Sequence, residues 1–134
     1  MAFLQIFVSQ QLLFLFSKTS ECNIECDGLW DQLNRSLPPE STLKVPKNVL
    51  LKSFLPQQDI LAHKNTILFI THCGMHGVME SIYHEVPMVG MPVAFDQGDV
   101  LTRIEEKGIG IGISKWASPD LIVNAVKTVI KDAR

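Results

Sequence analysis

Several features that would assign a protein to a class are missing from this 134-residue sequence. It has no apolar run near the ~20 residues that a membrane-spanning helix requires. Cysteine is scarce, and Cys22, Cys26 and Cys73 are too few for a disulfide framework. Cys22 and Cys26 either pair with each other or remain two thiols. Lysine and arginine form no cluster and the formal net charge is -2, so nucleic acid is not an expected partner.

The N-terminal segment lacks the basic residues with which a secretory signal begins. Residues 1–16 are apolar, but three glutamines interrupt them. Two interpretations remain, a secretory signal or a helix end (3–7) followed by a strand (12–16), and the second fits these residues better.

The composition is that of one globular domain, with 46% hydrophobic and 19% charged residues. Residues 19–44 interrupt it, because polar residues and two consecutive prolines dominate them and no strand or helix period holds. Such a long loop is unusual inside a compact domain, so we interpret the segment as an irregular insertion or loop. Asn34 begins a glycosylation triplet that has meaning only in a secretory compartment.

Residues 54–97 organise the rest of the chain. The apolar run at 67–71 predicts a buried parallel strand, and His72, Cys73 and Gly74 break it. Residues 75–85 have the spacing of a helix, and residues 88–93 predict a second strand, followed by a loop that ends at Asp96 and Gln97.

Strand, turn, helix and strand form one βαβ unit of a parallel sheet. In such sheets ligands bind at the carboxyl ends of the strands, where helix N-termini present free N–H groups to anions. Residues 72–77 and 95–97 both fall at that edge, so we predict the ligand site there.

Further elements flank this unit. We predict a strand at residues 48–54 and a short helix that begins at Pro56. Residues 98–107 predict a helix that Gly108 caps. Residues 108–113 predict a strand, because their G-x-G-x-G spacing differs from a dinucleotide fingerprint. Ser118 starts a last helix, whose buried side should consist of Leu121, Ile122, Ala125, Val126, Val129 and Ile130.

Residues 54–97 also resemble the signature of the UDP-glycosyltransferases, the family that includes the UDP-glucuronosyltransferases. That signature has an aromatic residue, Pro-Gln, a strand ending in Thr-His-x-Gly, a helix with an acid, a proline-bounded strand and a closing Asp-Gln. The matching residues are Phe54, Pro56, Gln57, Thr71, His72, Gly74, Glu80, Pro87, Pro92, Asp96 and Gln97. Cys73 departs from the family, where a second glycine is usual, and its side chain should narrow the margin for backbone approach to phosphate. His76 also departs, since asparagine is usual there.

The resemblance implies an α/β fold, a Rossmann-like doubly wound parallel sheet that forms the C-terminal half of a GT-B glycosyltransferase, truncated at its first strand. It divides the chain into residues 1–18, which should hold a helix end (3–7) and a strand (12–16), the insertion at 19–44, and a UDP-sugar-binding core at 45–134.

The family transfers a sugar from a UDP donor to a lipophilic acceptor, with inversion and without a metal or other cofactor. Its catalytic base is a histidine of an N-terminal acceptor domain that we expect to lie outside this chain, so no catalytic residue is assigned here. The family is also expected on the lumenal side of the endoplasmic reticulum membrane and in assemblies with copies of itself or other members.

The family's binding residues map onto this sequence individually. Phe54 would stack on uracil, Gln57 would contact the nucleoside, and Glu80 would accept from both ribose hydroxyls. His72 would donate to the diphosphate, which Gly74 lets the backbone approach. The remaining members of the UDP-sugar-binding set are His76, Gly77, Asp96 and Gln97, of which Asp96 and Gln97 would contact the sugar.

Alternative interpretations stay open at this point. His72 alone could be a histidine that bonds to the backbone, and His63, His72, Cys73 and His76 together suggest a metal. The spacing matches no structural zinc pattern, and His72 and Cys73 should face opposite sides as strand neighbours. The hypotheses are thus a glycosyltransferase donor part, an inactive nucleotide-sugar-binding or subunit-interaction module, and a His/Cys metal protein.

Overall fold

The structure is a computed structural model that describes residues 4–9, 11–17, 49–52 and 56–132. For the first three of these segments it describes the backbone. The segment 19–44, with Cys22, Cys26 and Asn34, lies outside the described residues, and so does Phe54.

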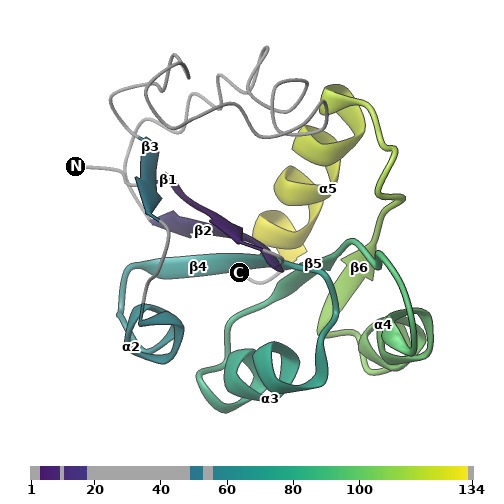
Figure 1. The fold of residues 1–134 in the computed structure, drawn as a ribbon, viewed down its shortest axis with the longest axis horizontal. Coiled ribbons are helices and arrows are strands. Elements are labelled where there is room, and N and C mark those ends of the chain that lie inside the picture. The colour runs from purple at the N-terminus through teal and green to yellow at the C-terminus, as the bar shows by residue number, and fades with distance from the viewer. Residues whose placement is uncertain (1–3, 10, 18–48, 53–55, 133–134) are drawn as a thin grey trace.

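The described residues form one six-stranded sheet in the order β3-β1-β2-β4-β5-β6 (Figure 1). In chain order the strands are β1 (Leu4–Ser9), β2 (Gln11–Ser17), β3 (Val49–Lys52), β4 (Thr66–Thr71), β5 (Met88–Gly90) and β6 (Gly110–Gly112). β5 lies parallel to both β4 and β6. With α3 (Met75–Tyr83) between β4 and β5, the predicted βαβ unit is confirmed.

The N-terminal part of the sheet differs from the prediction. Residues 4–7 belong to strand β1, so the predicted helix end at residues 3–7 is wrong for these four residues. Ile6, Phe7 and Val8 favour a pleated strand over a helix, and β1 pairs with β2 in antiparallel register, Leu4 opposite Phe16. Since β2 also runs antiparallel to β4, the sheet is mixed, and its continuously parallel part is β4, β5 and β6.

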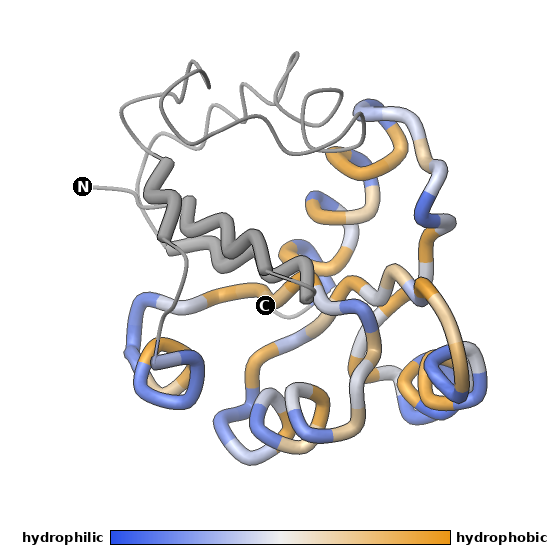
Figure 2. The backbone as a smooth tube through the Cα atoms, in the orientation of Figure 1, coloured by the Kyte–Doolittle hydropathy of each residue, from blue (hydrophilic) through white to orange (hydrophobic). Residues whose placement is uncertain are grey.

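Helices cover both faces of the sheet (Figure 1). α5 (Pro119–Asp132) lies on one face, while α2 (Gln57–Leu61), α3 and α4 (Gln97–Glu106) lie on the other. Alternation along β4 serves both layers, because Leu68 and Ile70 pack beneath α5 and Phe69 packs toward α3 and α4. In Figure 2 hydrophobic residues, coloured orange, lie along β4 and on the sides of α2 and α4 that are nearer to the sheet. Burial of each large apolar side chain contributes about 1.5–3 kcal/mol to the stability of the fold. The two clusters of buried side chains therefore hold the helices against the sheet.

Most element boundaries lie close to the predicted ones. Gly108 has a φ of 66° directly after the C-cap of α4, as the predicted helix stop requires. β5 and β6 span three residues each and are shorter than predicted. On α5, Leu121 is 57% exposed, so its predicted burial is wrong, whereas Ile122 is buried. Among the described residues, no helix combines the length and the apolar character that a membrane crossing needs.

Candidate functional site

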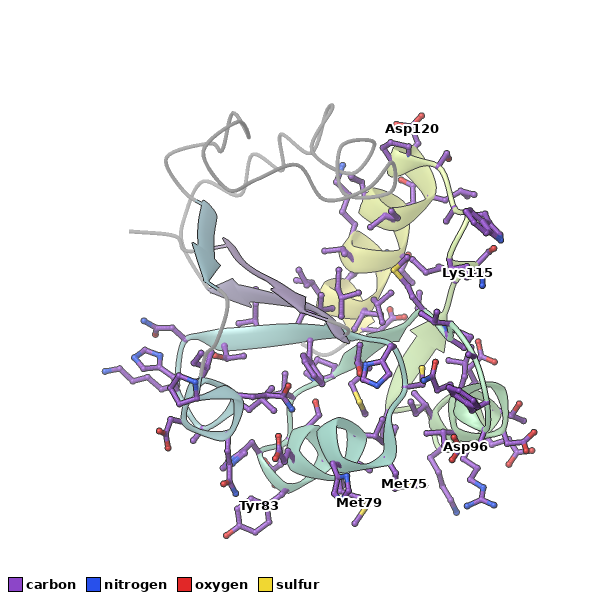
Figure 3. The ribbon with its side chains drawn as sticks, in the orientation of Figure 1. Met75, Met79, Tyr83, Asp96, Lys115 and Asp120 are labelled. Atoms are coloured by element: carbon purple, nitrogen blue, oxygen red, sulfur yellow. The ribbon has the colours of Figure 1, made fainter. Side chains whose placement is uncertain are left out.

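Two loops meet the same edge of the parallel strands. Residues 72–74 join β4 to α3, and residues 91–96 join β5 to α4. Because β4 and β5 are parallel, both loops lie at the carboxyl ends of the strands. Figure 3 shows Met75 at the start of α3 and Asp96 at the start of α4 on the side of the sheet that these helices cover. Both loops therefore lie at the edge of the sheet where the sequence predicted them.

The turn after β4 is fixed by Thr71 and Cys73. Cys73 has a φ of 68°, and its N–H donates to Oγ1 of the buried Thr71 at 3.2 Å. This left-handed conformation suits glycine and costs other residues about 1–2 kcal/mol, which explains why glycine is the expected residue here.

The Cys73 side chain points into the core and away from the site. The residue is fully buried among the apolar side chains beneath α3 and α4, and a Cβ added to Gly90 would lie 2.6 Å from its Sγ. The expectation that Cys73 narrows the backbone approach is therefore wrong. Burial, with a smaller contribution from the charge of Glu105, raises the pKa of the thiol to about 11, so the thiol is protonated at neutral pH.

His72 lies half-buried at the start of this turn. Its imidazole rests against Gly74 so closely that a Cβ at Gly74 would overlap the ring. Its Nδ1 is buried and has no hydrogen-bond partner among the described residues. Such an atom costs about 1–3 kcal/mol until something pairs with it. Burial also lowers the pKa of His72 below 6.5, so the ring is neutral at pH 7.

Gln57 and Glu80 form a second part of the site. Nε2 of Gln57 donates to Oε2 of Glu80 at 2.6 Å, across 23 residues of sequence and between α2 and α3. Gly77 faces this pair, since a Cβ there would lie 3.3 Å from Gln57 Nε2. The structure therefore brings together three residues that the sequence assigned to the same ligand.

The third part is the loop before α4. Oε1 of Gln97 accepts from the backbone N–H of Val93 at 2.8 Å and of Ala94 at 3.0 Å. Gln97, which was predicted to contact the sugar, thus also holds the backbone of this loop, and neither its residue type nor its position predicted that role. Asp96 is exposed and occupies the N-cap of α4 without a side-chain hydrogen bond to the first turn. Its carboxylate therefore remains available to a ligand.

The remaining candidates gather less closely. His76 is exposed on the first turn of α3, and no hydrogen bond to another described side chain holds it. Within the described segments, no three His, Cys, Asp or Glu side chains come together as a metal group. His72 and Cys73 do have different surroundings, the one beside Gly74 and the other in the core.

Sequence reasoning missed two contacts near the site. Thr71 belongs to the signature, but the signature did not predict that its Oγ1 accepts the Cys73 N–H. Lys115 lies after β6 and donates from Nζ to the Val93 carbonyl at 3.2 Å. No sequence pattern links residues 22 positions apart in this way.

Comparison with solved structures defines the class of protein. The glycotransferase of kitacinnamycin matches 66% of this chain, and 23% of its own, with a TM-score of 0.61 and 32% identity. A variant of Os79 from O. sativa in complex with UDP matches 65% of this chain, and 22% of its own, with a TM-score of 0.61 and 29% identity. The fold is therefore that of a GT-B glycosyltransferase domain.

The family follows from the sequence itself. The profile described as "UDP-glucoronosyl and UDP-glucosyl transferase" matches residues 27–134. Mus musculus UDP-glucuronosyltransferase 3A2 is 38% identical over 107 residues, which are 79% of this chain and 20% of that protein. Homo sapiens UDP-glucuronosyltransferase 2B10 is 45% identical over 87 residues, 63% of this chain and 16% of that protein. The chain belongs to the UDP-glucuronosyl and UDP-glucosyl transferase family, and it spans a fifth or less of the length of these relatives.

Proposed function

We propose that this chain is the donor-binding part of a UDP-glycosyltransferase. It binds a UDP-sugar, and the whole protein transfers the hexosyl or glucuronosyl group to a lipophilic acceptor with inversion. Family membership and the matching fold of a UDP-bound relative support this function. The observation that carries it is His72, whose ring lies against Gly74 at the N-terminus of α3 and whose buried Nδ1 has no hydrogen-bond partner among the described residues.

The diphosphate would lie at this turn. The N-cap of α3 is Gly74, and no side chain caps the first turn. The first N–H groups of the helix are therefore open to an anion, and the helix dipole favours negative charge there. The neutral ring of His72 has one N–H, which can donate a hydrogen bond to a phosphate oxygen. Gly74 leaves room for the ring and the ligand to approach the backbone.

The nucleoside would lie along α2 and α3. Gln57 holds one oxygen of the Glu80 carboxylate, which fixes the orientation of the group. A carboxylate accepts several hydrogen bonds, so the remaining lone pairs can accept from two ribose hydroxyls. Phe54, Gln57 and Gly77 complete the nucleoside side of the proposed contacts, and His76 would add a donor near the phosphates.

In transfer, the acceptor oxygen attacks the anomeric carbon, and the bond from that carbon to the diphosphate breaks. The acceptor proton passes to a base of the acceptor domain. This chain would stabilise the departing UDP, because negative charge grows on the diphosphate that His72 and the α3 N–H groups contact. Asp96 and Gln97 would orient the sugar. No metal or further cofactor enters this scheme.

Membership of the family supports three wider proposals. The protein would work on the lumenal side of the endoplasmic reticulum membrane, and it would assemble with itself or with other family members. Small lipophilic acceptors would be the second substrates of the whole protein.

Calorimetric titration of the purified chain with UDP and with ADP tests the donor site. The chain should bind UDP more tightly than ADP, and it should transfer no sugar from UDP-glucose to a phenolic acceptor by itself. Equal binding of the two nucleotides would contradict the assigned nucleoside contacts. Turnover by this chain alone would contradict the proposal that the base belongs to the acceptor domain.

A further inference from the structure

The loop that carries Asp96 has a backbone conformation that its own sequence disfavours. Phe95 has a φ of 59°, and its ring is 97% exposed, so no packing of the ring compensates for this conformation. A bulky residue in the left-handed region costs about 1–2 kcal/mol. Such a conformation persists only where neighbouring structure determines it. Contacts elsewhere in the protein must therefore hold the loop.

Two side chains hold the loop by hydrogen bonds to its backbone. Gln97 accepts from the N–H groups of Val93 and Ala94 at the start of α4. Lys115 donates from Nζ to the carbonyl of Val93 at 3.2 Å. Among the hydrogen bonds of the described residues, this is the one that joins a side chain from beyond α4 to the loop backbone at 93–96.

Lys115 is itself held in place. Its Nζ lies 5.3 Å from the centre of the Trp116 ring, within the range of a cation–π contact. The turn that presents it is closed by Ser114, whose Oγ accepts from Trp116 N–H at 3.1 Å and whose carbonyl accepts from Ala117 N–H at 2.9 Å. Ala117 is buried and anchors this turn to the core beneath α5. Figure 3 shows Lys115 on the segment between β6 and α5, on the same side of the molecule as Asp96.

We propose that Lys115 is a positioning residue for the sugar of the donor. It fixes the Val93 carbonyl, and through it the loop whose last residue, Asp96, and whose neighbour Gln97 would contact the sugar. Trp116 limits the directions in which the ammonium group can point. This inference rests on the proposed function, since it assigns Lys115 to the sugar end of the same donor site. Lys115 acts through the loop and makes no contact with the substrate.

The test compares Lys115→Met with Lys115→Arg by calorimetric titration with UDP, UDP-glucose and UDP-glucuronic acid. Loss of one exposed hydrogen bond to the loop should weaken both UDP-sugars by about 3- to 10-fold. UDP should bind unchanged, because it lacks the sugar. Lys115→Arg should restore most of the affinity, since a guanidinium donates to carbonyls and stacks on indole rings. Lys127→Met, on the exposed side of α5, is the matched control and should match the wild type throughout.

The two sugars distinguish positioning from direct contact. If Lys115→Met weakened UDP-glucuronic acid alone, the ammonium would pair with the sugar carboxylate, and the positioning role would be overturned. An equal loss for UDP would likewise overturn it, because the effect would then reach the whole site.

Hydrogen exchange tests the hold on the loop without any ligand. The amides of Val93 and Ala94 should exchange about 3- to 10-fold faster in Lys115→Met than in the wild type, while core amides of β4 stay unchanged. Unchanged exchange at Val93 and Ala94 would overturn the inference. If the wild-type chain bound no UDP, the proposed function would fail, and the exchange result would still decide what Lys115 does to the loop.

Discussion

At Gln97 an effect on the stability of the loop can be separated from an effect on the affinity for the sugar. Its Oε1 accepts from Val93 N–H and Ala94 N–H, so the amide nitrogen alone would remain for the proposed sugar contact. Gln97→Glu keeps the acceptor and removes the donor. A carboxylate accepts strongly from backbone N–H groups, and a negative charge at the first residue of α4 adds about 0.3–1 kcal/mol. The variant should therefore be as stable as the wild type or slightly more stable.

The ligand affinities should respond differently. Loss of one neutral donor costs about 0.5–1.5 kcal/mol, or about 2- to 12-fold in the affinity for UDP-glucose. UDP should be nearly unaffected. Thermal unfolding and calorimetric titration of the same samples measure both effects. Gln97→Leu is the control, because it removes acceptor and donor together and should lower both stability and UDP-glucose affinity.

Either of two results would refute this reasoning. Unchanged UDP-glucose affinity in Gln97→Glu would mean that the amide nitrogen does not contact the sugar. A clear loss of stability in the same variant would mean that the carbonyl does not hold the loop as the structure shows.

Three further predictions concern Glu80, Cys73 and His72. Glu80→Gln can still accept from Gln57 but loses its charge, so UDP and uridine should both lose about 1.5–3 kcal/mol of affinity in titration, and an effect on UDP alone would argue against a ribose contact. Cys73→Gly relieves the left-handed strain at φ 68° while Cys73→Ala keeps it, so thermal unfolding should show the glycine variant to be the more stable of the two; the opposite order would contradict that backbone conformation. Burial lowers the pKa of His72, so the unfolded chain binds its proton first as pH falls below about 6.5, and the wild type should lose stability there. Denaturant unfolding of His72→Ala should show a smaller loss over the same pH range, and an equal loss would mean that His72 does not titrate as assigned.

Local patterns in the sequence were enough to predict the central unit of the fold. The apolar run before His72, the glycine break and the helix-like spacing after it depend on neighbours along the chain. The same is true of Gly108, whose position directly after α4 predicted a helix stop. These features position both loops at the carboxyl edge, so the place of the candidate site in the fold followed from them.

Pairings between distant segments could not be predicted in this way. Residues 4–7 were predicted as a helix end, but they pair with β2 as strand β1. The antiparallel register of this pair depends on the partner strand and not on local spacing. The contacts from Gln57 to Glu80 and from Lys115 to Val93 span 23 and 22 residues. The direction of the Cys73 side chain depended on its positive φ, which residue type alone does not reveal.

The central claim is that the turn after β4 binds the diphosphate of a nucleotide through His72. Titration of wild type and His72→Ala with UDP and with uridine tests it most directly. UDP should lose about 1.5–3 kcal/mol, or about 10- to 150-fold, as expected for a hydrogen bond to a charged group. Uridine has no phosphate and should bind both proteins equally. Unchanged UDP affinity, or an equal loss for uridine, would contradict the claim.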